Sequence, residues 1–113
     1  MTENTTTSPT GRLREALSAP DASTRLQSAL TAGTHPHDGY LPVLMARCAV
    51  EPDFYVRDML TWAITRHDRT RAVDLLRAEL ASPVPQARSQ ALHSLSKIGD
   101  PRAWSVITPD LLR

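Results

Sequence analysis

The feature that most constrains how this chain can fold is an internal repeat with a period of 31 to 32 residues. A proline precedes an arginine by five positions three times: Pro20 and Arg25, Pro52 and Arg57, Pro83 and Arg88. The same offsets align apolar columns, among them Leu13, Met45, Leu76 and Ile107. A period of roughly 20 to 50 residues is typical of stacked units that bury their apolar faces against one another. We therefore expect one domain built as a stack of similar units.

Each unit is predicted to contain two α-helices. In the stretch 38–50, Leu41, Leu44, Met45 and Cys48 recur at three- and four-residue spacing, which is the period of one helix face. The prolines of the repeat stand where a second helix would begin, and the glycine of "GDPR" stands where one would end. The predicted first helices lie near 11–18, 38–50, 70–81 and 101–112, and the second helices near 21–32, 53–67 and 84–98. No stretch alternates apolar and polar residues long enough to predict a strand.

The third unit carries the most specific pattern, in the stretch "SPVPQARSQALHSLSKIGDPRA". Its order of proline, small residue, arginine, alanine, leucine and a Gly-Asp turn is similar to that of HEAT repeats, and the similarity covers about residues 11–113. The resemblance implies an all-α, right-handed α-α superhelix of about three and a half helix pairs. The repeats would span about 11–36, 37–68, 69–100 and, in part, 101–113. The polar stretch 1–10 is predicted to be a disordered leader.

Charge and cysteine content limit the classes of function. The net charge is +1 and the pI is about 8.0, which gives no bulk attraction to nucleic acid or to membranes. Cys48 is the only cysteine, so no internal disulfide can form. The chain carries no recognisable secretion signal and no apolar run long enough to span a bilayer. We therefore expect a cytoplasmic protein that has no membrane partner.

The HEAT resemblance also implies a structural role for the arginine column. In HEAT repeats this arginine pairs with an acid near the turn between the two helices, and such pairs tie neighbouring repeats into a ladder. At the turn beside Arg57, the candidate acids are Glu51 and Asp53. The third unit has neutral residues in the corresponding places, so the ladder is in doubt at Arg88. The predicted ladder residues are Arg25, Arg57, Arg88, Glu51 and Asp53.

One face of the second helices is a candidate binding surface, which the resemblance implies to be the concave one. On the helix 53–67, a strip of side chains points away from the core face, and the positions one unit later continue it. The predicted partner-binding residues are Tyr55, Asp58, Trp62, Arg66, Gln86, Ser89, His93 and Lys97. Aromatic residues and arginine dominate the energetics of protein interfaces. The leading hypothesis is therefore a noncatalytic scaffold or adaptor that binds a protein partner and needs no cofactor.

Two polar stretches between units are alternative candidates for chemistry. "THPHD" holds His35, His37 and Asp38, which are residue types that bind zinc or iron, but the spacing fixes no further ligand. We interpret it as a polar loop in which Asp38 caps the next helix, and we predict no metal site. "RHDRTR", which contains His67, is interpreted as an exposed turn in preference to a phosphate site. Cys48 is predicted to be a buried thiol without a catalytic role.

A second hypothesis from another class is nucleic-acid binding. The alkylpurine DNA glycosylases use a HEAT-like array whose concave face cradles DNA with aromatic and acidic residues. A similar face would be formed here by Tyr55, Asp58, Trp62, Arg66 and Lys97. The modest basicity of this chain weighs against a DNA cradle, so a protein partner is preferred. The incomplete last unit, with Trp104 and Leu112, also raises the hypothesis of self-association through the C-terminal helix.

Overall fold

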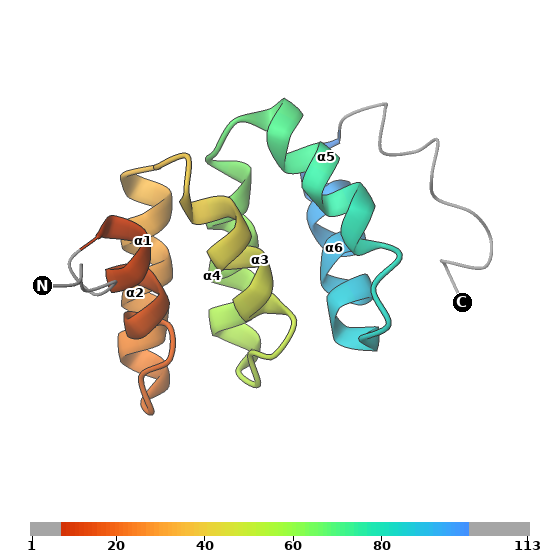
Figure 1. Cartoon of the computed structure of the whole chain (residues 1–113). Coiled ribbons are helices and arrows are strands. Elements are labelled where there is room, and N and C mark those ends of the chain that lie inside the picture. The colour runs from red at the N-terminus through yellow and green to blue at the C-terminus, as the bar shows by residue number, and fades with distance from the viewer. Residues whose placement is uncertain (1–7, 100–113) are drawn as a thin grey trace, which may run out of the picture.

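The computed structural model describes residues 8–99, and this part of the chain consists of six α-helices joined by short turns (Figure 1). The helices are α1 (Pro9–Ala16), α2 (Ala22–Thr34), α3 (Tyr40–Cys48), α4 (Phe54–Thr65), α5 (Arg69–Glu79) and α6 (Pro85–Ile98). They form three pairs stacked side by side, with α1, α3 and α5 in one layer and α2, α4 and α6 in the other (Figure 1). The predicted all-α helical repeat is therefore confirmed. The predicted helix at 101–112 and most of the predicted leader lie outside the described residues.

The first helix begins earlier than the sequence predicted. Pro9 is its first residue, where proline costs nothing because the first amide has no partner within the helix. Ser8 caps this end, since its hydroxyl accepts a hydrogen bond from the Gly11 amide at 3.0 Å. The predicted start at residue 11 was therefore wrong by two residues, because the serine cap and the proline within "SPT" were assigned to the leader.

Aspartates begin three of the six helices. Asp21, Asp53 and Asp68 each accept a hydrogen bond from the backbone amide three residues later. Asp38, by contrast, does not cap α3, which corrects the prediction. Gly39 holds the N-cap position of α3, and its helix end has no side-chain cap. At the other end of the array, Gly99 ends α6 at a φ of 71°, a left-handed conformation that favours glycine.

The core lies between the two layers and runs the length of the array. The largest side chains with less than 2% exposure come from both layers, and they include Leu17, Leu41, Leu44, Leu60, Ile64 and Leu95. Each such side chain contributes about 1.5–3 kcal/mol through burial. The aligned pairs Leu60 with Ala91 and Ile64 with Leu95 are all buried, so the repeat register predicted the core columns correctly.

The second helices make the closest contacts between units. Helix α2 packs against α4 more extensively than α4 packs against α6, and the first helices contact one another less. Gly33 permits the approach of α2 to α4, because a Cβ built there would lie 2.3 Å from Cζ3 of Trp62. None of the helices within residues 8–99 has both the length and the apolarity that a bilayer span requires.

Candidate functional site

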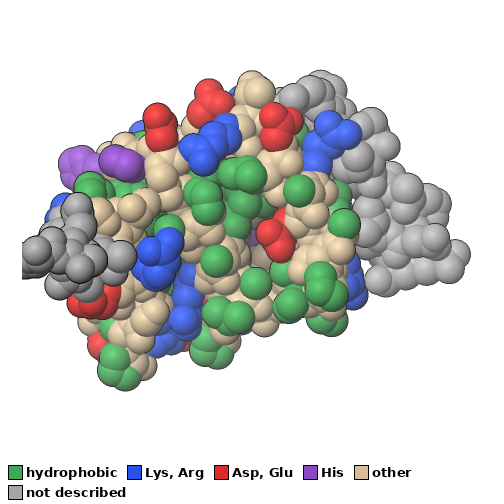
Figure 2. All heavy atoms as spheres, in the orientation of Figure 1, with side chains coloured by type: hydrophobic (Ala, Val, Ile, Leu, Met, Phe, Trp, Pro, Cys, Tyr) green, Lys and Arg blue, Asp and Glu red, His purple; other side chains and the backbone are tan. Residues whose placement is uncertain are grey.

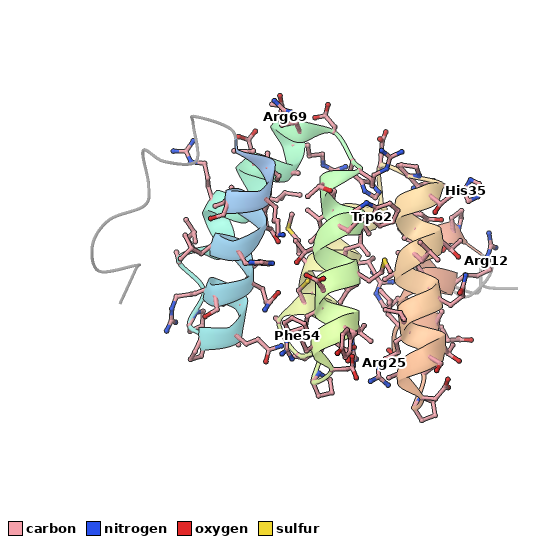
Figure 3. All side chains as sticks on the ribbon, turned by 180° about the vertical axis from the view of Figure 1, so that it is seen from behind. Arg12, Arg25, His35, Phe54, Trp62 and Arg69 are labelled. Atoms are coloured by element: carbon pink, nitrogen blue, oxygen red, sulfur yellow. The ribbon has the colours of Figure 1, made fainter. Side chains whose placement is uncertain are left out.

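The exposed face of the second helices contains an apolar groove between α2 and α4. It has a volume of about 510 Å³ and is lined by Leu26, Leu30, Tyr55, Asp58, Met59 and Trp62. We call this feature the α2–α4 groove. Figure 3 views this layer, and Trp62 lies on the side of α4 that faces α2. Three of the predicted partner-binding residues therefore line one concavity.

Helical spacing explains why these side chains share a face. Asp58 and Met59 each lie three or four residues from both Tyr55 and Trp62, which places all four along one stripe of α4. The opposite stripe of the same helix is the core face, with Val56, Leu60, Ala63 and Ile64 buried. Leu26 and Leu30, four residues apart on α2, form the facing wall. The groove thus follows from two adjacent amphipathic helices whose outer stripes remain apolar.

Trp62 belongs both to the packing of the array and to its surface. Its ring fits over Gly33 of α2, yet the residue retains 38% exposure. The Arg66 guanidinium lies 5.9 Å from the centre of the indole ring, and its Nε donates to the Gly33 carbonyl at 3.4 Å. Tyr55 differs, because it is 72% exposed and its only ring contact among the described residues is with Phe54. Tyr55 is therefore the aromatic side chain that is free for a ligand.

Among residues 8–99, Asp58 is the only charged residue that lines the groove. Its side chain is 59% exposed, and its Oδ1 lies 3.9 Å from Nε2 of His93 on α6. That separation exceeds hydrogen-bond length, and His93 carries a charge only when protonated. Within residues 8–99, no lysine or arginine forms an ion pair with Asp58. The groove therefore presents a carboxylate without a permanent cation beside it.

The predicted strip does not continue evenly onto α6. Gln86 turns into the array, where its Nε2 donates to the carbonyls of Cys48 and Glu51 at 2.8 and 2.9 Å. The prediction had placed this side chain on the open surface. It turns inward because the Cys48 and Glu51 carbonyls of the preceding unit lie within hydrogen-bond distance. Ser89 is exposed outside the groove. Lys97 is also exposed, and it lines a separate hollow of about 150 Å³ with His67 and Arg69.

Of the predicted arginine ladder, the described residues show one ion pair between units, from Arg25 of the first unit to Glu51 of the second. Glu51 is buried, and its two carboxylate oxygens accept hydrogen bonds from Nε and the terminal nitrogen of Arg25 at 3.0 and 3.1 Å. Arg47, one helical turn earlier, donates to the same carboxylate at 2.9 Å. Arg25 lies between the lower ends of α2 and α4 in Figure 3. The prediction that Glu51 or Asp53 pairs with Arg57 is therefore wrong, since Asp53 caps α4 instead.

Every arginine of the column forms hydrogen bonds with the backbone of its own unit. The guanidiniums of Arg25, Arg57 and Arg88 each donate to carbonyls five or six residues earlier, in the turn between the paired helices. These carbonyls belong to Ala19 and Pro20, to Glu51 and Pro52, and to Ser82. The arginine therefore closes its own turn whether or not an acid is present, which explains why it persists in the third unit.

The environment of Glu51 sets its protonation. Burial alone would raise the pKa of this carboxyl group, but hydrogen bonds from Arg25, the Asp53 amide and Arg47 outweigh burial. The pKa of Glu51 is lowered from its ordinary value of 4.5 as a result. The group therefore holds a buried negative charge that two arginines from adjacent units neutralise.

His67 is buried, which corrects the interpretation of "RHDRTR" as a wholly exposed turn. Its Nδ1 lies 2.7 Å from the Ala63 carbonyl, and its Nε2 accepts a hydrogen bond from the His37 amide at 3.3 Å. The rings of His37 and His67 both pack near Tyr40. This histidine therefore fastens the loop between α2 and α3 to the end of α4.

No metal-binding group is found in the described part of the chain. No three histidine, cysteine or acidic side chains within residues 8–99 converge closely enough to hold an ion. His37 uses its Nδ1 to accept a hydrogen bond from the Gly39 amide at 3.0 Å. Cys48 is buried, and burial together with the nearby charge of Glu51 raises the pKa of its thiol to about 12. Such a thiol stays protonated near neutral pH and is a poor nucleophile.

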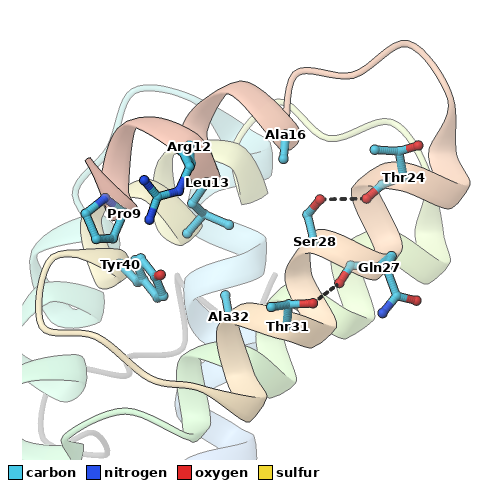
Figure 4. A pocket seen from close by; sticks show the side chains of 10 residues that line it. All are labelled: Pro9, Arg12, Leu13, Ala16, Thr24, Gln27, Ser28, Thr31, Ala32 and Tyr40. Carbon is cyan, nitrogen blue, oxygen red and sulfur yellow. Dashed lines mark hydrogen bonds between the residues drawn. The ribbon is translucent and has the colours of Figure 1, made fainter. Parts of the chain in front are cut away.

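A second hollow lies between α1 and α2, with a volume of about 480 Å³ (Figure 4). Leu13, Ala32 and Tyr40 contribute its apolar part. Its polar part includes Ser28 and Thr31, whose hydroxyls donate to carbonyls one turn earlier on α2. Since these donors are already used within the helix, the hollow offers fewer directed contacts than its polar lining suggests.

The sequence prediction missed the α2 wall of the groove. Leu26 and Leu30 were not selected, although the 32-residue offset that aligns the first two units places them in the columns of Asp58 and Trp62. The strip was extended forward to α6 and not backward to α2. Applying the 32-residue offset from α4 back to α2 as well would have identified both leucines.

The opposite face of the molecule has a different character. Figure 2 shows acidic and basic side chains mixed along the edge that carries the loops between units, with apolar side chains in smaller groups below them. This view shows no extended field of one charge over the described residues. The α2–α4 groove, in contrast, combines aromatic and aliphatic side chains with a single acid.

Comparison with known families agrees with this architecture. The family model described as HEAT repeats matches residues 41–109, which is more than half of the chain. The match begins at α3, so the first unit lies outside it, although α1 and α2 pack in the same layered manner. No curated protein matches the chain. The repeat register, the paired helices and the family match together show that this chain belongs to the HEAT-repeat family.

Proposed function

We propose that this chain is a noncatalytic scaffold that binds a segment of a protein partner on its second-helix face, in the α2–α4 groove. The observation that carries the proposal is the lining of this groove, where Tyr55 and Trp62 remain exposed between aliphatic walls. Contiguous exposed apolar surface is typical of interaction sites, and aromatic residues contribute much of the binding energy at protein interfaces. HEAT repeats are in general scaffolds for protein interactions, which agrees with this reading.

The composition of the groove suits a peptide segment. A volume of about 510 Å³ is within the range of ligand pockets, so several side chains can enter it. Met59 adds a flexible, polarisable side chain of the kind that adapts to different apolar ligands. Within the described part of the chain, the one charged residue of the lining is an acid. Nucleic acid is the less favoured ligand, because its phosphates require a cationic surface.

The test begins with affinity capture from lysate of the source cells, using the full chain as bait and samples with and without nuclease. Any captured protein is then purified and titrated against three baits: wild type, Tyr55→Ala and Val50→Ala. Val50 is the matched control, because it is also an exposed apolar residue but does not line the groove. We expect Tyr55→Ala to weaken binding about tenfold or more, as loss of an interface anchor does, and Val50→Ala to leave it unchanged.

Trp62→Ala is a poorer first variant, because the ring also packs on Gly33 and its loss disturbs the contact between α2 and α4. Equal affinity for wild type and Tyr55→Ala would remove the groove from the proposal. Capture that disappears with nuclease would favour the nucleic-acid hypothesis instead.

A further inference from the structure

We propose that the α2–α4 groove receives a lysine or arginine side chain of the partner, with its charged end at Asp58. This inference rests on the proposed function and specifies the chemistry of the bound segment. It describes a segment whose apolar residues flank a central cation, and it excludes segments that place an acid at the same point.

The first observation is the position of the acid. Asp58 lies about one helical turn from Tyr55 on one side and from Trp62 on the other, so it occupies the middle of the groove's α4 wall. No described lysine or arginine forms an ion pair with it. An apolar ligand that covered Asp58 would remove water from a carboxylate and give nothing in return, which is costly. A ligand with a cation at this point offsets much of that cost through its attraction to the carboxylate.

The neighbouring His93 does not fill this role. Its Nε2 lies 3.9 Å from Oδ1 of Asp58, and its side chain is nearly half exposed on α6, outside the groove. At this separation the imidazole donates no hydrogen bond to the carboxylate. The cation of the bound segment would therefore add a contact that the free protein lacks.

The second observation is the apolar lining on either side of the acid. Lysine and arginine bury their aliphatic stems on apolar surface while the charged end remains near polar groups. Leu26, Met59 and the Tyr55 ring offer such a surface beside Asp58. The Tyr55 ring, which is 72% exposed, is also available for a cation to approach its face.

The protein already contains an example of this kind of contact. Arg66 places its guanidinium 5.9 Å from the centre of the Trp62 ring, so the aromatic surface on this side of α4 accepts a cation. Because Arg66 also bonds to the Gly33 carbonyl, it belongs to the structure and leaves Asp58 uncompensated. Tyr55 and Asp58 together offer the equivalent pair of contacts to a ligand.

The experiment uses a phage-displayed library of random short peptides, selected on the full chain. Peptides are kept when they bind wild type and not Leu30→Asn, which places a neutral polar side chain in the groove wall. A kept peptide is then synthesised in two forms, one with its basic residue and one with norleucine in its place. Both are titrated against wild type, Asp58→Asn and the control Asp38→Asn, which removes a carboxylate from the loop between α2 and α3.

We expect the kept peptides to contain a lysine or arginine between apolar residues. The basic form should bind wild type about fivefold more tightly than the norleucine form, as for a partly exposed ion pair. Asp58→Asn should abolish this preference, and Asp38→Asn should preserve it. The preference should also weaken as salt is added.

The outcomes separate the two proposals. Groove-dependent peptides that lack a basic residue, or that bind Asp58→Asn as tightly as wild type, would overturn the inference and leave the scaffold proposal standing. If no selected peptide depends on the groove, both proposals fail. Because the peptide is varied as well as the protein, the result does not depend on whether Asp58→Asn alters folding.

Discussion

Glu51 connects all three described units of the array. Its carboxylate binds Arg25 of the first unit and Arg47 of its own, while its carbonyl accepts hydrogen bonds from Arg57 and from Gln86 of the third unit. Because both the side chain and the backbone of one buried residue are used in this way, its position depends on neighbours on either side. Through this one residue, the turn between α3 and α4 contacts all three described units.

Replacing Glu51 by alanine should therefore be strongly destabilising. The substitution leaves Arg25 buried without its acid, and loss of one partner from a buried pair costs about 3–5 kcal/mol. Urea unfolding followed by circular dichroism measures the change in the free energy of unfolding. Arg47→Ala is the matched control, because Arg47 is more exposed and Arg25 still neutralises Glu51. If both variants lost the same stability, the buried Arg25–Glu51 pair would contribute no more than the more exposed Arg47–Glu51 pair.

Acid should weaken the fold through the same residue. The pKa of Glu51 is lowered in the folded chain, so folding favours its ionised form. The stabilisation is complete above the ordinary pKa of 4.5 and is lost as pH falls below it, through the depressed folded value. Unfolding free energies measured from pH 7 down to acid should decline in this range. Glu51→Gln should show a shallower decline, and an identical decline would assign the acid sensitivity to other carboxyl groups.

Residue identity alone predicted the arginine column but not its partners. The columns showed that Arg25, Arg57 and Arg88 share a role, because the spacing from the preceding proline is constant. Which acid each arginine meets depends on the distance between units in space, and the offset along the chain does not contain that distance. The rung from Arg25 to Glu51 therefore became visible only when the helices were packed.

At the scale of elements, the helix starts differ in quality. The N-cap residue of α2, of α4 and of α5 is an aspartate whose side chain caps the backbone. The N-cap residue of α6 is Val84, which provides no side-chain cap. The backbone of Val84 has φ −87° and ψ 115°, close to the −88° and 127° of the capping Asp53. The geometry for a cap is therefore present at α6, and only the side chain is missing.

Val84→Asp should therefore stabilise the protein. A capping aspartate contributes about 1 kcal/mol, and Val84 is 42% exposed, so little burial is lost. Thermal and urea unfolding should both show the gain. Val84→Ala shortens the same side chain without supplying a cap and should show no gain. A Val84→Asp chain no more stable than Val84→Ala would mean that α6 does not start as the backbone angles indicate.

The sequence predicted the helices well but their ends less well. Every described helix lies at a predicted place, since the three- and four-residue periodicity of apolar side chains is strong in each unit. The boundaries depend on single capping groups, and these compete locally. At α3, for example, Asp38 was a plausible cap, yet the chain turns so that Gly39 takes the position.

At the scale of the whole molecule, the two junctions between units are unequal. The junction between the first and second units has the most extensive helix packing and the buried Arg25–Glu51 pair. At the next junction the corresponding acid is replaced by Ser82, and the Gln86 side chain bonds to turn carbonyls instead. In a linear array, stability is roughly a sum over units and junctions, so unequal junctions give unequal local stability.

Native-state hydrogen exchange should show this inequality. Amides of α5 and α6 are expected to exchange through openings of lower free energy than those of α2 and α4, because the described residues form no buried ion pair between the second and third units. Measuring exchange at two pH values confirms that the rates report equilibrium opening. Equal protection across all six helices would show that the array unfolds as one unit and that the junctions are matched.

The repeat register predicted the layered stack and its core, because both follow from periodicity along the chain. The groove is different, since its two walls come from consecutive units and its shape depends on how closely α2 approaches α4 at Gly33. The predicted helix near 21–32 stopped short of Gly33, which lies within α2. The close approach of two helices depends on how they pack, and a single glycine in the sequence is not enough to predict it.

The placement of Trp62 over Gly33 also has a mechanical consequence. The indole ring sits at the joint between two units, and the same ring forms part of the groove. A ligand that contacts Trp62 in the groove therefore also contacts the joint between the first two units. A ligand that bridges α2 and α4 binds only while the two helices are packed together, so occupancy of the groove would stabilise the joint between the first two units.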